Sequence, residues 1–393
     1  MDKNLRTPLL LLAGCVLLLV CLVVSELSDA FAFDAPTSQR PIRLVVALFV
    51  FATVVYWFSV AVVWRFGATK TGERAVVVFA ILFRLILLPS FAIQEIDYFR
   101  YLWDGRVTAA GLNPYRFSPR QIEIFGPQAD PSSELGQLWR LTEADQKDAQ
   151  PRPVTLIFKN IHPESDFIRD VPTVYPPASQ WVFALAASLT PASAPLSVHV
   201  LVLKIVLVAF DMGAMFLLMA LLRQLKLCPA LALVYGWCPL VLKEFANSSH
   251  LDSIAIFFTV LSAYLLVRAT TKTVVEGESP AANVSAGKPA GAGMLFGCGS
   301  SAALAAGVLA KSYPVILLPV VAGYLFSRWR LRALLPLFVF PSCSLHRLSA
   351  IFLFGSRCRR HRSSFRSTQT HDHRSQNLSY QMGNERFPLH DRV

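Results

Sequence analysis

Long apolar runs separated by polar stretches are the main pattern of this 393-residue chain. A helix that crosses a bilayer needs roughly 20 predominantly apolar residues, and the first three runs meet that length. The runs that we expect to cross the membrane are residues 8–27, 42–64, 75–93, 196–222, 229–242, 251–267, 294–310 and 315–326. The pattern therefore predicts an all-α polytopic membrane protein built as a transmembrane helix bundle.

Basic residues gather in alternate loops and predict the orientation of the helices. Lys3 and Arg6 precede the first run, and the loop at residues 65–74 is also basic. Cytoplasmic loops carry an excess of Lys and Arg, so we expect a multi-pass membrane protein with a cytoplasmic N-terminus. Residues 180–189 are too short to span. We interpret them as re-entrant or interfacial, because this keeps the basic loops on one side.

Composition narrows the class of protein. Hydrophobic residues make up 54% of the chain and charged residues 16%, with a mean hydropathy of +0.47. The net charge of +12 would suggest a nucleic-acid partner in a soluble protein. Here the basic residues lie in short loops between apolar runs, so we expect contact with membrane lipids and no nucleic acid. The seven cysteines form no Cys-x-x-Cys pair and are interpreted as small hydrophobic residues.

Three regions depart from the apolar pattern. Residues 94–178 are rich in proline and charge and predict a structured outer loop, a usual seat of function. Residues 270–292 are small and polar and predict a cytoplasmic linker. After residue 341 the chain becomes rich in Ser, Arg and His. We therefore separate a membrane domain at 1–341 from a basic tail at 342–393, which is either disordered or the product of a reading-frame change.

A pair of carboxylates, Glu95 and Asp97, opens the outer loop. The polar segments at residues 243–252 and 311–314 fall on the same side in this topology, so we expect one common outer site. Asp97 is the candidate base that would deprotonate an acceptor hydroxyl. Glu95 would assist it, or the two would bind a divalent cation, Mg²⁺ or Mn²⁺. The simpler alternative is a helix-end cap that faces lipid headgroups.

Other polar and aromatic residues on that side are candidates for substrate contacts. Cationic groups suit a phosphate leaving group, and aromatic rings stack on sugar faces. The candidates for phosphate or donor binding are Arg100, Arg106, His250 and Lys311, and those for substrate binding are Trp103, Asp104, Asn113, Tyr175 and Asp252. Asn247, together with His250 and Asp252, could orient the sugar or bind phosphate. Headgroup contact, interfacial aromatic belts, helix caps and a snorkelling lysine are the simpler alternatives.

Charged residues also occur inside the apolar runs. Lys204 and Asp211 are seven residues apart and lie on one face of a helix, which predicts an internal pair. Arg84 is expected to find its partner elsewhere in the bundle.

Several short motifs occur in a recognisable order. They are Glu95-Ile-Asp97-Tyr, Tyr101-Leu-Trp-Asp-Gly-Arg106, Gly111-x-Asn-Pro-Tyr115, Tyr175-Pro-Pro177, His250-Leu-Asp252 and Lys311-Ser-Tyr-Pro314. Through these motifs and their order, residues 75–340 of the chain resemble the GT-C polytopic glycosyltransferases. The greatest likeness is to bacterial polyprenyl-phosphate-mannose-dependent mannosyltransferases and to the catalytic subunit of GPI mannosyltransferase I.

The resemblance implies a lipid-linked sugar donor, a catalytic carboxylate at Asp97 and inversion at the anomeric carbon. Two departures are visible: Glu95 stands where relatives more usually have Asp, and relatives continue with further helices after residue 341. The combined hypothesis is an inverting hexosyltransferase that moves a sugar, mannose first of all, from a polyprenyl phosphate to a glycan or glycolipid acceptor on the extracytoplasmic face. A transporter of lipids or solutes and a truncated, non-catalytic membrane protein are the alternatives.

Overall fold

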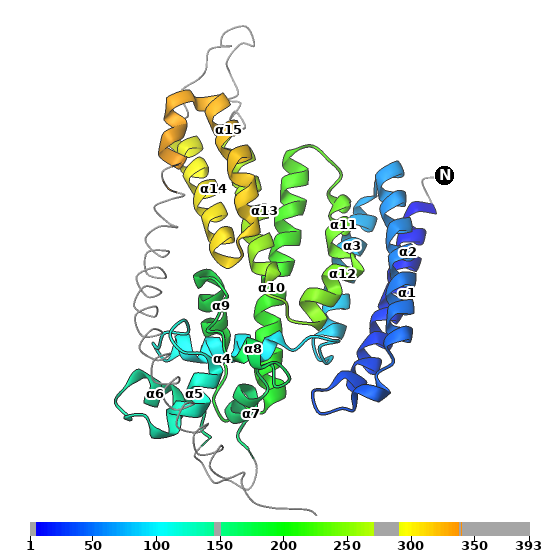
Figure 1. Ribbon diagram of the computed structural model, residues 1–393. Helices are drawn as coiled ribbons and strands as arrows, with labels where there is room; N and C mark the ends of the chain where they lie inside the picture. Colours follow the sequence, from blue (N-terminus) through cyan, green and yellow to red (C-terminus); the bar gives the residue numbers. More distant parts are fainter. Residues whose placement is uncertain (1–4, 145–150, 271–290, 338, 340–393) are drawn as a thin grey trace, which may run out of the picture. The chain divides into compact units, whose positions relative to one another are not determined.

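The computed structural model describes residues 5–144, 151–270, 291–337 and 339 (Figure 1). The chain divides into two units, residues 1–344 and 345–393, and all the described residues belong to the first. The predicted tail at 342–393 and residues 271–290 of the predicted linker lie outside the described residues. Every regular element in the described ranges is a helix, so the predicted all-α class is confirmed.

Within the described residues, five helices are long and apolar enough to cross a membrane. They are α1 (Arg6–Leu27), α2 (Ile42–Phe66), α10 (Leu196–Gln224), α13 (Asp252–Thr270) and α14 (Gly291–Ala310). Large apolar side chains face outward from them, among them Val54 at 64% and Trp64 at 75% exposed. Such surfaces suit contact with lipid, and the five helices indicate a multi-pass membrane protein.

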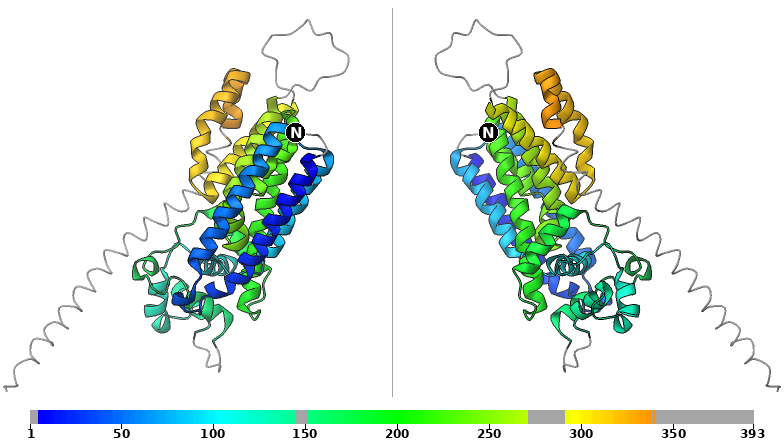
Figure 2. Two further views of the ribbon diagram at one scale, coloured as in Figure 1. Left: turned by 90° about the vertical axis from the view of Figure 1, so that its right-hand side faces the viewer. Right: turned by 90° about the vertical axis from the view of Figure 1, so that its left-hand side faces the viewer.

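The long helices pack in two groups. α1 lies against α2 and α3 (Lys70–Leu87), while α13 lies between α10 and α14 (Figures 1 and 2). One buried apolar cluster joins α1, α2 and α3 to α10 and to the segment that follows α10, and includes Phe83 and Trp237. A second cluster joins the loop after α3 to α10 and α13, and Phe99 and Leu207 belong to it.

The third apolar run forms a shorter helix than its sequence predicts. α3 begins at Lys70, capped by the Thr69 side chain, and ends at Leu87 rather than at residue 93. Pro89 follows two residues later, and proline has no backbone N–H with which to continue the helical hydrogen bonds. Residues 88–96 therefore lie outside regular helix, so the carboxylate pair does not follow a long helix directly. α3 is not among the five long apolar helices.

The charges inside the bundle pair differently from the prediction. The buried Arg84 guanidinium contacts Asp211 of α10, with Nε 2.6 Å from Oδ2, and donates to the carbonyl of Gly236 at 2.7 Å. Lys204 instead donates to the carbonyl oxygen of Ser90 at 2.5 Å. The predicted pairing of Arg84 within the bundle is confirmed. The predicted Lys204–Asp211 pair is wrong, because each side chain has a nearer partner on a neighbouring segment.

The run at residues 229–242 is not one spanning helix. It is divided into η5 (Pro229–Ala232), α11 (Leu233–Gly236), α12 (Pro239–Val241) and the π-helix η6 (Leu242–Asn247). Pro239 interrupts it, because proline supplies no backbone N–H and fits only the first turn of a helix. The last apolar run is likewise short, with η7 (Tyr313–Leu317) before α15 (Leu318–Trp329).

The predicted outer loop is a set of short helices. They are α4 (Asp97–Ala109), α5 (Pro119–Phe125), η4 (Gly126–Gln128), α6 (Glu134–Leu141), α7 (Pro153–Lys159) and α8 (Asp166–Arg169). α9 (Pro177–Ser188) follows, is only 12 residues long, and packs against α4. Gly105 permits this close approach, since a Cβ there would lie 2.4 Å from the carbonyl oxygen of Phe183. The remaining short helices are η2 (Ser28–Phe31), η3 (Thr37–Gln39) and η8 (Arg330–Ala333).

Candidate functional site

Three segments far apart in the sequence meet at the start of α4. The first carries Glu95 and Asp97. The second contains His250, in the turn before α13, and Asp252, the first residue of α13. The third begins after α14 with Lys311. His250 Nε2 lies 3.9 Å from Glu95 Oε2, and Lys311 Nζ lies 2.7 Å from Asp252 Oδ2. The three polar segments that the sequence places on one side therefore lie in contact in the structure, and their role as a common outer site stays a prediction.

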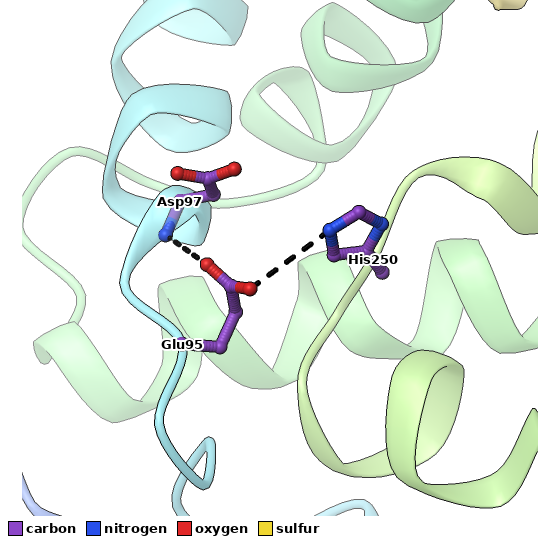
Figure 3. Close-up of side chains that lie close together, drawn as sticks. All are labelled: Glu95, Asp97 and His250. Carbon is purple, nitrogen blue, oxygen red and sulfur yellow. Dashed lines mark hydrogen bonds and ion pairs between the residues drawn. The ribbon is translucent and has the colours of Figure 1, made fainter. Parts of the chain in front are cut away.

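Glu95 links the N-terminus of α4 to His250 (Figure 3). Its Oε1 accepts from the backbone N–H groups of Ile96 and Asp97, both at 2.9 Å. These two donors belong to the helix start, where N–H groups lack helical partners. The expected role of a helix cap therefore applies to one oxygen of Glu95. The other oxygen faces the imidazole of His250.

Asp97 is held at both carboxylate oxygens. His162 Nε2 lies 2.8 Å from Oδ1, and the Tyr175 hydroxyl donates to Oδ2 at 3.2 Å. Burial by itself raises the pKa of Asp97, but the hydrogen bonds from His162 and Tyr175 outweigh it and the pKa falls below its ordinary value. Asp97 is therefore a carboxylate at neutral pH, with about a quarter of its side chain open to solvent.

His250 is oriented by a second carboxylate. Its Nδ1 lies 2.6 Å from Asp252 Oδ2, the same oxygen that accepts from Lys311. The hydrogen bond to Asp252 raises the pKa of His250 against the opposing effect of burial, and Glu244 and Glu95 add to the rise. With Nδ1–H directed at Asp252, Nε2 is the nitrogen that faces Glu95.

The donor set fits a divalent cation. Glu95, Asp97 and His250 each offer one ligand atom, and the three atoms lie within 4.8 Å of one another. Carboxylate oxygen and imidazole nitrogen are both ligands of Mn²⁺ and related ions. A carboxylate on the far nitrogen of a ligating histidine, as Asp252 is here, is a common outer partner in metal sites. The sequence assigned Glu95 and Asp97 to such a site, and the structure adds His250.

Several predicted site residues belong to the scaffold instead. Arg100 and Asp104 form a buried i,i+4 pair with Nε 2.9 Å from Oδ1. Asp104 also accepts from the amide of Gln180 at 3.2 Å, which ties α4 to α9. Trp103 is 2% exposed and packs on Phe158 with ring centroids 4.8 Å apart. These three residues position α4 rather than contact the cluster.

Two further candidates lie at the other end of α4. Arg106 is half-buried and its guanidinium lies 3.4 Å from the ring nitrogens of His199 on α10. Asn113 Oδ1 accepts from the backbone N–H of Tyr115 at 2.9 Å and so shapes the turn after the helix. The contacts of both residues are with these neighbours and not with Glu95 or Asp97.

Asn247 has a role that its sequence position does not reveal. Its side chain is fully buried, donates to the Ser90 hydroxyl at 2.8 Å and to the Phe91 carbonyl at 2.7 Å, and accepts from Ile93 N–H at 3.0 Å. The prediction that Asn247 orients a substrate is wrong, because these contacts are with the backbone and side chain of residues 90–93. Asn247 fixes the segment that leads to Glu95.

His162 is the site residue that sequence reasoning missed. It stands 65 residues after Asp97, and the only signal in the sequence is its position beside Pro163 in a polar loop.

Comparison of the chain with protein-family models, with curated proteins and with solved structures gives no match. The geometry of the site therefore carries the functional argument by itself, beside the motif resemblance.

Proposed function

We propose that this protein is a membrane glycosyltransferase. It moves a sugar, mannose in the first instance, from a polyprenyl-phosphate donor to a glycan or glycolipid acceptor on the extracytoplasmic face of a bacterial inner membrane. The observation that carries the proposal is the ionised, half-buried carboxylate of Asp97, which is grouped with Glu95 and His250 through ligand atoms within 4.8 Å of one another. His250 is held by Asp252, which also binds Lys311, and the structure has long apolar helices that could cross a membrane. The order of the sequence motifs supports the same class of enzyme.

In the proposed reaction the acceptor hydroxyl oxygen attacks the anomeric carbon of the donor. The bond from that carbon to the phosphate oxygen breaks, the polyprenyl phosphate leaves, and the configuration at the carbon inverts. Asp97 takes the proton of the hydroxyl. Its lowered pKa makes it a weak base, but this suffices because the hydroxyl becomes acidic as its oxygen bonds to the sugar.

The leaving phosphate gains negative charge and needs a cationic partner. Lys311 meets this need best, since its side chain is 38% exposed and its ammonium group has donors beyond the one that contacts Asp252. Arg100 is less suited, because its guanidinium is buried against Asp104. The pKa of His250 is raised by Asp252, so without a bound cation a protonated His250 would be a second positive group beside Lys311.

Glu95, Asp97 and His250 would hold a divalent cation. The cation would supply positive charge for a phosphate oxygen of the donor. The three side chains belong to two segments, so such an ion would also tie the start of α4 to the turn before α13. Asp252 would keep Nε2 of His250 available as a ligand.

Transfer of radiolabelled mannose from polyprenyl-phosphate-mannose into membrane products tests the proposal. Vesicles that contain the wild-type chain should support transfer, and Asp97→Asn should lower it by about 10²–10⁴-fold at equal expression. Asn keeps the size of the side chain and can still accept a hydrogen bond from His162 or Tyr175. Equal transfer by both proteins would remove Asp97 from the chemistry, and no transfer by the wild type would contradict the proposed donor and reaction.

A further inference from the structure

His162 holds the carboxylate of Asp97 from a distant part of the loop. Its Nε2 lies 2.8 Å from Asp97 Oδ1, while the Tyr175 hydroxyl occupies Oδ2 at 3.2 Å. The backbone N–H of Asp97 is bound in turn to Glu95 Oε1. An aspartate side chain has two rotatable bonds, and donors on opposite oxygens restrict both of them.

The backbone at His162 is itself in an unusual conformation. Its φ is +44°, in the left-handed region that residues other than glycine seldom adopt. The residue before it, Ile161, is fully buried in the loop's apolar core, and the His162 carbonyl accepts from Ser165 N–H at 3.1 Å. These contacts hold the turn in place, and the conformation directs the imidazole at Asp97. Strained backbone of this kind concentrates at functional sites.

The second donor is anchored as well. The Tyr175 carbonyl accepts from the Tyr115 hydroxyl at 2.8 Å, and the Tyr175 ring meets the Tyr101 ring edge-on at 4.9 Å between centroids. Burial and the nearby Asp97 charge hold the pKa of Tyr175 well above its usual value, so its hydroxyl keeps the proton that it donates. Asp97 is thus fixed between two donors that are each anchored in the loop.

We propose that His162 is a positioning residue of the active site: it acts through Asp97 and holds that carboxylate, together with Tyr175, in the orientation that receives the acceptor hydroxyl. The inference rests on the proposed glycosyltransferase function. The His162 side chain is 15% exposed and that of Asp97 is 28% exposed, and the proposed role requires no direct contact between His162 and the sugar. A carboxylate that rotates away loses alignment with the hydroxyl, and misplacement of a catalytic group by about 1 Å costs on the order of 10²-fold in rate.

The test compares full-length variants in the mannose-transfer assay. His162→Ala should lower kcat about 10- to 100-fold while KM for polyprenyl-phosphate-mannose changes less than about twofold, because substrate binding is untouched. His162→Gln, which retains an N–H donor, should recover a large part of the loss. Tyr175→Phe, which removes only the hydroxyl, should also lower kcat. Glu164→Ala, an exposed neighbour in the same turn, is the control and should behave as the wild type.

A double variant separates positioning from folding. In the Asp97→Asn background, His162→Ala should lower kcat little further. His162 is proposed to act by orienting the Asp97 carboxylate, and that carboxylate is already absent from this background. If the alanine variant is unstable in detergent, the glutamine and Tyr175→Phe variants still decide the matter. Wild-type kcat in His162→Ala, with Asp97→Asn inactive, would overturn this inference alone. Absence of transfer by the wild type would overturn the proposed function, and the inference with it.

Discussion

Nδ1 of His250 lies 2.6 Å from Oδ2 of Asp252, and this one oxygen also receives the ammonium group of Lys311 at 2.7 Å. A histidine and a lysine therefore share one carboxylate oxygen. The arrangement connects the turn before α13 to the residue that follows α14. It also directs Nε2 of His250 at Glu95. Asp252 therefore organises the site, although the candidate cation ligands are Glu95, Asp97 and His250.

The raised pKa of His250 predicts a pH-dependent stability. The folded protein binds this proton more tightly than the unfolded chain, so the stabilisation is complete below the unfolded pKa of about 6.5. It is lost as the pH rises through the higher pKa of the folded state. In detergent with EDTA, we expect the Tm of the wild type to fall between about pH 6 and pH 8.5 by more than the Tm of His250→Gln. Parallel curves for the two proteins would contradict this prediction.

Cation binding can be measured without any assay of transfer. Mn²⁺ at about 100 times its Kd should stabilise the folded protein by about 2.7 kcal/mol, and EDTA should reverse the effect. Glu95→Gln retains an oxygen that can cap α4 but loses the charge, so its Tm should rise less with Mn²⁺. Glu164→Gln, an exposed acid outside the site, is the matched control. Equal Tm shifts in the wild type, Glu95→Gln and His250→Gln would show that the ion binds elsewhere.

The buried Arg84–Asp211 pair predicts an asymmetric pattern of stabilities. Asp211→Leu alone leaves a buried guanidinium without its carboxylate and should destabilise the protein by about 3–5 kcal/mol. The double variant Arg84→Met with Asp211→Leu removes both charges and should be closer to the wild type. The measurement is thermal unfolding in detergent. A double variant less stable than Asp211→Leu alone would contradict the argument.

Loss of the Asn247 contacts should loosen the carboxylate pair. Asn247→Asp is nearly isosteric and still accepts from Ile93 N–H, but it no longer donates to Ser90 or to Phe91. We expect a destabilisation of about 1–3 kcal/mol from the unpaired buried groups. Leu240→Ala, at a side chain that is 65% exposed on the preceding helical segment, should change stability much less.

The sequence predicts the long helices well because the bilayer sets their length and excludes most charges. It fails where proline intervenes: Pro89 ends α3 early, and Pro239 divides the run at residues 229–242. Hydropathy counts these residues as part of an apolar run, whereas the backbone loses a hydrogen-bond donor there. The extent of α3 and the π-helix η6 therefore could not be obtained from hydrophobic pattern alone.

For the site, the sequence predicted which segments lie near one another, but it did not predict the contacts between residues of different loops. The alternation of basic and polar loops places Glu95, His250 and Lys311 on one side, and the structure brings Glu95 to His250 and Lys311 to Asp252. The contacts form although the run at residues 229–242, which its hydropathy predicts as one helix, is divided. Nothing in the spacing joins His162 to Asp97. Helical periodicity predicted a pair between Lys204 and Asp211 because they lie on one face of the same helix. It cannot predict a partner on a different helix, such as Arg84 of α3.

The Arg84–Asp211 contact also bears on how the protein is made. The two residues are 127 positions apart in the sequence. At about 5–20 residues per second, the ribosome therefore synthesises Asp211 on the order of 10 s after Arg84. α3 carries charges and is not one of the five long apolar helices, so it enters the bilayer less readily by itself. Stable insertion of α3 should therefore wait for α10, and a nascent chain that stops before Asp211 should leave α3 accessible to reagents in the aqueous phase.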